Sequence, residues 1–206
     1  MNADDLKQQL LDWTVRNSGA EQRTYLGMSS ISECSLELYR RMLEPRQWTM
    51  SQHLYCYNGY LFERDLKARL AGLGLYAPGS ERELVATFDA RFIGHTDGAL
   101  VTGEMLEIKS THQEKLDRIV SEGRIPMANF EQVQTYMRHG NYYRAFVVYV
   151  ARDSGNLHVF EMRLVLAVAD RLDIKAKRIL RAVDEQRPPK CECRRCKIPA
   201  AFEPME

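Results

Sequence analysis

Apolar residues recur every three or four positions in five stretches of the chain, and this spacing predicts amphipathic helices. In the second stretch, Ser29 or Ser30 is suited to cap the helix, because Glu33 follows Ser30 by three positions as in a capping box. Cys34 then lies in the first turn of that helix. The predicted helices span residues 4–17, 30–44, 51–73, 129–140 and 165–183.

Alternating or continuous apolar runs predict the β-strands. Residues 91–101 and 104–110 are separated only by Thr102 and Gly103, so we expect these two strands to pair as a hairpin. Residues 144–152 form a continuous apolar run, which is typical of a buried central strand. The predicted strands span residues 83–90, 91–101, 104–110, 144–152 and 157–164.

The order of these elements predicts an α/β fold with a mixed central β-sheet flanked by helices. The polar segment 111–129, which contains Gly123 and Pro126, is predicted to be a loop with one helical turn. A length of 206 residues suits one domain, so we expect a single domain over residues 1–206 with its core at about 51–186.

The composition agrees with an ordinary soluble globule, with 45% hydrophobic and 28% charged residues. No apolar run approaches the roughly 20 residues that a membrane-spanning helix needs. The acidic N-terminus also lacks the apolar core of a signal peptide. We therefore expect a cytoplasmic protein with no membrane partner.

The net charge of +1 neither requires nor excludes nucleic acid as a partner, but the charge is unevenly distributed. Residues 171–206 contain ten Lys or Arg against six Asp or Glu. Such a basic section is able to contact phosphates. A helix with one solvated basic face explains it equally well.

Two carboxylates and one lysine are candidates for chemistry. Glu107 and Lys109 are two apart on a predicted strand, so their side chains share one face while Ile108 points to the other. The expected hairpin brings Asp97 beside them. Carboxylates that hold Mg²⁺ or Mn²⁺, with a lysine that orients water or stabilises charge, suit metal-assisted phosphodiester hydrolysis. A solvated hairpin with ordinary surface charges is the alternative.

The five cysteines are unevenly placed. An odd number, with three of them packed into six residues, argues against the disulfide framework of a secreted protein. In a cytoplasmic protein such a cluster more often marks a metal or iron–sulfur site. The cysteines are Cys34, Cys56, Cys191, Cys193 and Cys196.

Three motifs together resemble the RecB-like branch of the PD-(D/E)XK nuclease superfamily, over roughly residues 28–196. The branch has a G-x-x-D motif near the first strand, E-x-K on the next strand and Q-x-x-x-Y on the following helix. The resemblance implies a restriction-endonuclease-like αβββαβ core. The matching segments here are Gly94-His95-Thr96-Asp97, Glu107-Ile108-Lys109 and Gln132-Val133-Gln134-Thr135-Tyr136.

The resemblance also implies a role for each matching residue. Asp97 and Glu107 would coordinate Mg²⁺ or Mn²⁺, together with the backbone carbonyl of Ile108. Lys109 would serve the attacking water. The family further implies that Gln132 and Tyr136 brace the site and contact DNA.

An earlier helix of this branch supplies a further acidic residue or histidine after a glycine. Glu63, which follows Gly59 by four positions, matches the acidic version and would be a third metal ligand. Many members of the branch have histidine at this position, and this chain does not.

The cysteine layout is similar to that of AddB-type helicase–nucleases and CRISPR adaptation nucleases, which hold a [4Fe–4S] cluster. One cysteine precedes the nuclease core and three follow it. The resemblance implies that the cluster joins residues 28–44 to residues 187–206. The Cys-x-Cys-x-x-Cys spacing is tighter than expected, so a Cys₄ zinc site and a small structural redox pair remain alternatives. The implied ligands are Cys34, Cys191, Cys193 and Cys196.

Together these features predict a metal-dependent deoxyribonuclease, acting as an exonuclease on DNA that is single-stranded or has free ends. One alternative is a DNA-binding or DNA-end-processing subunit that is active only with a helicase or integrase partner. Another is a metal-stapled structural protein whose charged hairpin is coincidental.

Overall fold

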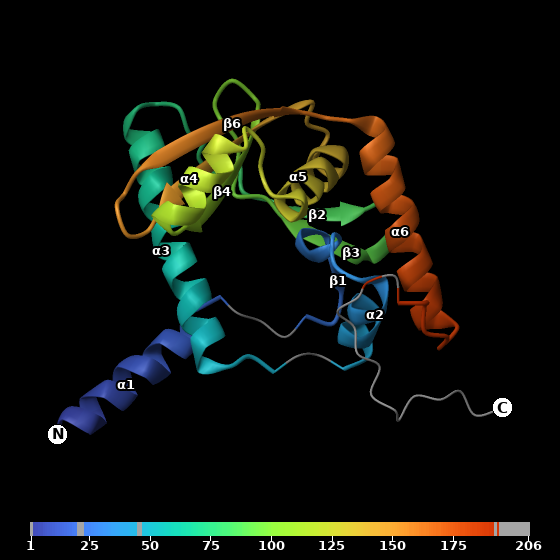
Figure 1. Ribbon diagram of the computed structural model, residues 1–206, viewed down its shortest axis with the longest axis horizontal. Helices are drawn as coiled ribbons and strands as arrows, with labels where there is room; N and C mark the ends of the chain where they lie inside the picture. Colours follow the sequence, from blue (N-terminus) through green and yellow to red (C-terminus); the bar gives the residue numbers. More distant parts are fainter. Residues whose placement is uncertain (1, 20–22, 45–46, 192, 194–206) are drawn as a thin grey trace.

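The computed structural model describes residues 2–19, 23–44, 47–191 and 193. Helices surround the strands, and α6 lies on the opposite side of the molecule from α3 (Figure 1). The elements are α1 (Ala3–Arg16), β1 (Leu26–Gly27), the 3₁₀ turn η1 (Met28–Ser30), α2 (Ser35–Leu43), α3 (Met50–Gly72), β2 (Glu83–Ala86), β3 (Asp89–His95), β4 (Met105–Thr111), α4 (Gln113–Ser121), α5 (Met127–Gly140), β5 (Arg144–Ala151), β6 (Leu157–Arg163) and α6 (Leu166–Asp184).

The strands form two three-stranded mixed sheets, with the orders β1-β3-β2 and β4-β5-β6. In the second sheet β5 is parallel to β4 and antiparallel to β6. The expected mixed α/β architecture flanked by helices is therefore confirmed, with the strands divided between two sheets. The prediction of a buried central strand is also confirmed, because β5 lies in the middle of its sheet and six of its eight residues are buried.

Alternate residues of β4 and β5 pack on opposite faces of their sheet. On one face, Ile108 and Val148 belong to an apolar cluster with Leu66 of α3. On the other face, Val147 belongs to the main core with Val133 of α5. The sheet therefore lies between α3 and α5. On the face toward α5, the Glu107 side chain is buried and that of Lys109 is partly buried. Among the described residues, no helix is long and apolar enough to cross a membrane.

The expected hairpin is present between residues 98 and 106 but does not extend back into β3. Ala99 and Met105 form an antiparallel bridge, and Leu106 N–H donates to the Gly98 carbonyl at 2.9 Å. Leu100 N–H donates to the Glu104 carbonyl at 2.9 Å, but β3 ends at His95 and belongs to the other sheet. The reason lies at Gly98, whose φ of +126° takes the chain out of the strand conformation. On its other edge, β4 pairs in parallel with the apolar strand β5.

The predicted loop at residues 111–129 is wrong, because it contains α4. This helix is only nine residues long and mostly polar, so the apolar spacing of Leu116 and Ile119 was overlooked between His112 and the helix-breaking Gly123 and Pro126. Helix α5 begins at Met127 after Pro126, rather than at a cap formed by Asn129. The Asn129 amide instead donates to the Tyr149 hydroxyl at 2.5 Å.

The predicted capping box at Ser30 is also wrong. Ser30 belongs to η1, and α2 begins five residues later with Cys34 at its N-cap. The Glu33 carboxylate accepts from Arg41, with a closest N···O distance of 2.6 Å, so it is not available to cap the helix. An ion pair between Glu33 and a residue two turns into α2 therefore takes the place of the capping box.

Candidate active site

The face of β4 that α5 covers carries Glu107 and Lys109. The Glu107 side chain is only 1% exposed, and its Oε1 atom lies 2.6 Å from Lys109 Nζ. Their spacing of two residues on a strand places them on the same face, as expected. The ion pair is thus built into the strand, with Ile108 anchoring the opposite face in the apolar cluster.

Gln132 of α5 connects the two members of this ion pair. Its Nε2 donates to Glu107 Oε1 at 2.8 Å, and its Oε1 accepts from Lys109 Nζ at 3.0 Å. An amide is the side chain that offers both a donor and an acceptor at adjacent atoms. Gln132 therefore fixes the carboxylate and the ammonium relative to each other.

Asp97 reaches this site from the exposed edge of β4. Ile108 N–H donates to Asp97 Oδ2 at 2.6 Å, and Leu106 N–H donates to the Gly98 carbonyl at 2.9 Å. The N–H and C=O of one strand residue point to the same edge of a sheet. The carbonyl of Ile108 therefore faces the edge at which Asp97 lies.

Tyr136 of α5 and Gly94 of β3 are in close contact. A Cβ atom on Gly94 would lie 2.6 Å from Tyr136 Cε1 and 2.9 Å from Met28 Sδ, so only glycine fits here. Burial and the nearby charge of Glu107 raise the pKa of Tyr136 to about 12, so its hydroxyl remains protonated at neutral pH. The glycine of the G-x-x-D motif and the tyrosine of the Q-x-x-x-Y motif are thus required by the same contact.

The two carboxylates are in an unfavourable environment for negative charge. Burial and the charges of Glu107 and Glu63 raise the pKa of Asp97 well above its ordinary value. Burial also raises the pKa of Glu107, although Lys109 opposes it. Glu107 Oε2 is buried and accepts no hydrogen bond. An orphaned carboxylate oxygen beside a second carboxylate and a backbone carbonyl is a set of hard donors that fits a divalent cation.

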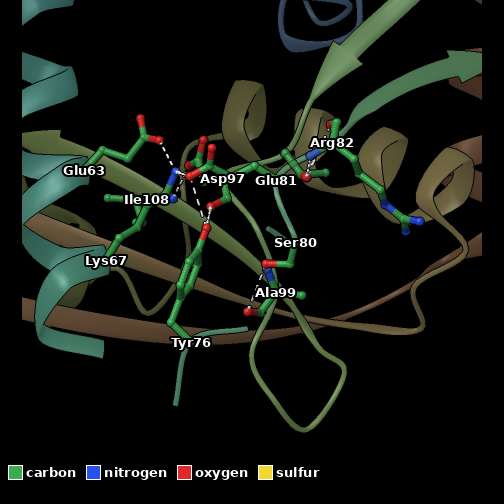
Figure 2. Close-up of polar contacts among 10 residues, drawn as sticks. Glu63, Lys67, Tyr76, Ser80, Glu81, Arg82, Asp97, Ala99 and Ile108 are labelled. Atoms are coloured by element: carbon green, nitrogen blue, oxygen red, sulfur yellow. Dashed lines mark hydrogen bonds and ion pairs between the residues drawn. The ribbon is translucent and has the colours of Figure 1, made fainter. Parts of the chain in front are cut away.

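Glu63 of α3 lies near this donor set but is directed to another partner. Its carboxylate is paired with the ammonium of Lys67, one turn later on the same helix (Figure 2). The ligand atoms of Glu63, Asp97 and Glu107 do not all approach within 4.8 Å of one another. The structure therefore brings six of the seven residues predicted for this site together and leaves Glu63 at the margin. The six are Asp97, Glu107, Ile108, Lys109, Gln132 and Tyr136.

The sequence analysis did not identify the polar network behind Asp97. Lys67 Nζ lies 2.5 Å from Glu81 Oε1, and the Tyr76 hydroxyl is 3.1 Å from the same atom. The Tyr76 hydroxyl is also 3.3 Å from the Asp97 carbonyl oxygen. Figure 2 shows Lys67 and Tyr76 directed toward Glu81 and Asp97.

The one signal for this network in the sequence is the spacing of four between Glu63 and Lys67 on a helix. Burial alone would lower the pKa of Lys67, but Glu63 and Glu81 outweigh this effect and raise it. Lys67 is therefore a permanent positive charge beside the carboxylates. Nothing in the sequence indicated Tyr76 or Glu81, because their placement depends on the path of the loop before β2.

The cysteines form a second group of possible ligands. Cys191 Sγ lies 3.8 Å from Cys34 Sγ and 3.7 Å from Cys193 Sγ. Among the described residues, these three form the only group of at least three histidine, cysteine or acidic ligand atoms within 4.8 Å of one another. Cys196, the fourth predicted ligand, lies outside the described residues.

No family model matches the sequence, and no curated protein matches it. Among solved structures, LHK-Exo in complex with dAMP has a TM-score of 0.65 and 13% identity, covering 85% of this chain and 93% of the other. An alkaline exonuclease (LHK-Exo) from Laribacter hongkongensis has a TM-score of 0.60 and 14% identity, covering 83% and 93%. SSO0001 has a TM-score of 0.58 and 17% identity, covering 84% and 85%. These similarities show that the chain has the same α/β fold as the alkaline exonuclease over most of its length.

Proposed function

We propose that this protein is a metal-dependent deoxyribonuclease that hydrolyses phosphodiester bonds in DNA. The observation that carries the proposal is the convergence of Asp97, Glu107 and Lys109 at the edge of β4, with Glu107 Oε2 buried and unpaired. The shared fold with an alkaline exonuclease supports the proposal and favours action on DNA ends.

Asp97, Glu107 and the carbonyl of Ile108 would hold Mg²⁺ or Mn²⁺, and Glu63 would contact the ion directly or through one of its waters. A bound divalent cation lowers the pKa of a coordinated water and offsets negative charge on the phosphate. A bound cation would give the orphaned Glu107 oxygen a partner and would favour the charged forms of Asp97 and Glu107, whose pKa values burial raises.

Lys109 would act as a donor and a positive charge. Although burial alone would lower the pKa of Lys109, the carboxylates of Glu107 and Asp97 outweigh it and hold that pKa above its ordinary value. Lys109 therefore stays protonated at neutral pH, which suits it to orient water or to stabilise charge on a phosphate oxygen. Gln132 holds its ammonium in place, and Tyr136 supports the strand that leads to Asp97.

We further propose that Cys34, Cys191 and Cys193 belong to a metal–thiolate site, with Cys196 as the fourth ligand. Four thiolates at 2.3 Å from one tetrahedral Zn²⁺ lie about 3.8 Å apart. The two Sγ–Sγ distances of 3.8 and 3.7 Å fit this spacing. A [4Fe–4S] cluster, which the family resemblance implies, binds each thiolate to a different iron and spreads the sulfurs further apart.

The nuclease proposal is tested by cleavage of labelled single- and double-stranded DNA in the presence of Mn²⁺ or Mg²⁺. We expect Asp97→Asn and Lys109→Met each to lower the rate by about 10³-fold or more, because each removes several kcal/mol of charge stabilisation. Asp173→Asn is the matched control, since Asp173 is also a largely buried carboxylate but pairs with His139 outside the site and outside the groove along α6. Unchanged cleavage in the Asp97 or Lys109 variant would contradict the proposal.

The same assay shows whether the chain is active alone or only as a subunit with a partner. If the isolated chain cleaves DNA, no helicase or integrase partner is required for activity. Analysis of metal and acid-labile sulfide after anaerobic purification shows whether the thiolate site holds a single zinc ion or a [4Fe–4S] cluster. One zinc per chain without sulfide supports the single-ion site, whereas four iron and four sulfide support the cluster.

A further inference from the structure

A groove of about 680 Å³ lies along α6, between the start of α2 and residues 187–190. We call it the basic groove, because its lining contains six cationic side chains and a single carboxylate, that of Glu185. None of the proposed catalytic or metal-binding residues lines it. The cationic residues are Arg171, Lys175, Arg178, Arg181, Arg187 and Lys190.

The cations of the basic groove follow one face of α6. Steps of four, three and three residues lead from Arg171 to Lys175, Arg178 and Arg181, so these side chains share a face. At 1.5 Å per residue, this row rises by about 15 Å. The strand of a DNA duplex carries one phosphate per about 3.4 Å of axis, so the row spans about four phosphates.

Half of these cations are already engaged within the protein. Arg171 pairs with Glu131 and Arg181 with Glu185, both at 2.6 Å. Lys175 Nζ donates to the carbonyl oxygen of Glu33 at 2.6 Å.

Three other cations of the basic groove are exposed: Arg178, Arg187 and Lys190. Within the described part of the chain, no ion pair neutralises any of them. Like charges repel, so gathering them without counter-charges is unfavourable unless an anion binds there. The groove is therefore a place where an extended anion would be stabilised.

An extended polyanion suits the groove better than a compact one. A single phosphate contacts only two or three neighbouring cations, whereas this row continues past the end of α6 to Lys190. The groove follows α6, and α6 lies on the opposite side of the molecule from α3, the helix of Glu63 (Figure 1). A ligand that reaches both regions must be long, as a DNA strand is.

We propose that the basic groove binds the phosphate backbone of the DNA substrate at a distance from the scissile phosphate. This inference rests on the proposed nuclease function and adds a second anchor for the same substrate. Contacts to phosphates alone carry no sequence information. The groove therefore holds DNA of any sequence and strengthens binding of molecules long enough to reach it.

The test measures binding of the full-length protein to a labelled 30-base-pair duplex by fluorescence anisotropy, in chelator, over a series of salt concentrations. Each lost phosphate contact reduces the slope of log K against log salt by about 0.9. We expect Arg178→Ala to reduce the slope by about one unit. The triple variant Arg178→Ala, Arg187→Ala, Lys190→Ala should reduce it by up to about three units and weaken binding at least about tenfold.

Lys177→Ala is the matched control on the same helix. Lys177 is exposed and carries the same charge, but its Nζ lies over the Phe88 ring, 4.6 Å from the centroid, and outside the groove. We expect this variant to keep the wild-type slope. The melting temperature and metal content of every variant are compared with wild type, and Arg178→Ala alone decides the test if the triple variant does not fold.

A wild-type slope in Arg178→Ala, or an equal loss in Lys177→Ala, would overturn the proposal. Loss of binding to labelled poly-glutamate with an unchanged DNA slope would also overturn it, and would indicate an acidic protein partner instead. The assay contains no divalent metal and measures no cleavage. A failure of the nuclease proposal is therefore seen separately, as the absence of metal-dependent hydrolysis by the wild-type protein.

Discussion

The two groups of possible metal ligands are built in opposite ways. The two central carboxylates, Asp97 and Glu107, are only ten residues apart, on the segment beside the edge of β4 and on β4 itself, and Gln132 of α5 holds Glu107 in place. The thiol group joins Cys34, at the N-cap of α2, to Cys191, which is 157 residues later in the chain. One site is a consequence of how a strand and a helix pack, and the other is a cross-link between distant segments.

The two groups are therefore expected to affect the stability of the folded protein in different ways. Buried carboxylates oppose folding, because the pKa values of Asp97 and Glu107 are raised above their ordinary range. A metal-bridged link between distant cysteines favours folding, because it restricts the unfolded chain. Removing ligands from the two sites should therefore change stability in opposite directions.

The largest effect on stability is expected for Cys34→Ser in the metal-loaded protein. Closing a loop of about 157 residues stabilises a fold by about 5 kcal/mol in the chain-entropy estimate. We expect the unfolding free energy, measured with denaturant, to fall by several kcal/mol. Cys56→Ser is the control, since Cys56 does not belong to the thiol group. An equal loss of unfolding free energy in Cys34→Ser and Cys56→Ser would contradict the view that Cys34 takes part in a metal-bridged cross-link.

A pair of glycine substitutions tests how tightly the carboxylate site is packed. Gly94→Ala places a methyl group against Tyr136 and Met28, and we expect a loss of about 1–3 kcal/mol from overpacking. Gly59→Ala, on α3, meets only Ser110 Oγ at 3.8 Å. We expect it to stabilise the protein by about 1 kcal/mol, because alanine favours a helix. Thermal unfolding of both variants is the measurement, and a harmless Gly94→Ala would show that the Tyr136 contact does not constrain the site.

The smallest effect is expected for Asp97→Asn in chelator. Because folding raises the pKa of Asp97, the metal-free protein loses stability as pH rises from the ordinary carboxyl pKa of about 3.9 through that raised value. Asparagine keeps the acceptor for Ile108 N–H but carries no charge. We expect its melting temperature to exceed wild type by a few degrees at neutral pH and to match it at low pH.

A saturating divalent cation should reverse the order of Asp97→Asn and wild type. The ion binds the folded carboxylate site, so it stabilises the wild-type protein by mass action and the variant less. A variant that is less stable than wild type even in chelator would contradict the view that Asp97 opposes folding.

The sequence was sufficient for those features that depend on regular spacing. The period of two placed Glu107 and Lys109 on one face, and the apolar run of β5 predicted its central position. The helix α4 was missed because it is only nine residues long and lies in a polar segment with Gly123 and Pro126, although Leu116 and Ile119 have helical spacing. The separation of β3 from β4 was missed because it depends on the backbone conformation at Gly98, where a positive φ ends the strand, and the apolar pattern does not show this break.

The same distinction applies within the active site. The motifs identified the residues that contact one another through α5 and β4. They did not identify Lys67 and Glu81, which meet through an ion pair between a helix and a loop. Such tertiary pairs have no fixed spacing in sequence, so only the folded structure shows that Lys67 pairs with Glu63 and Glu81 next to Asp97.

The hydrogen bond between Asp97 and Ile108 also affects how the protein behaves toward other copies of itself. A strand edge with open N–H groups is a template for pairing with another chain, and this leads to aggregation. Asp97 and the carbonyl of Gly98 occupy two such groups on β4. The residue proposed to hold a cation thus also protects the sheet from intermolecular β-pairing. An alanine at this position would expose the edge, whereas an asparagine would keep it closed.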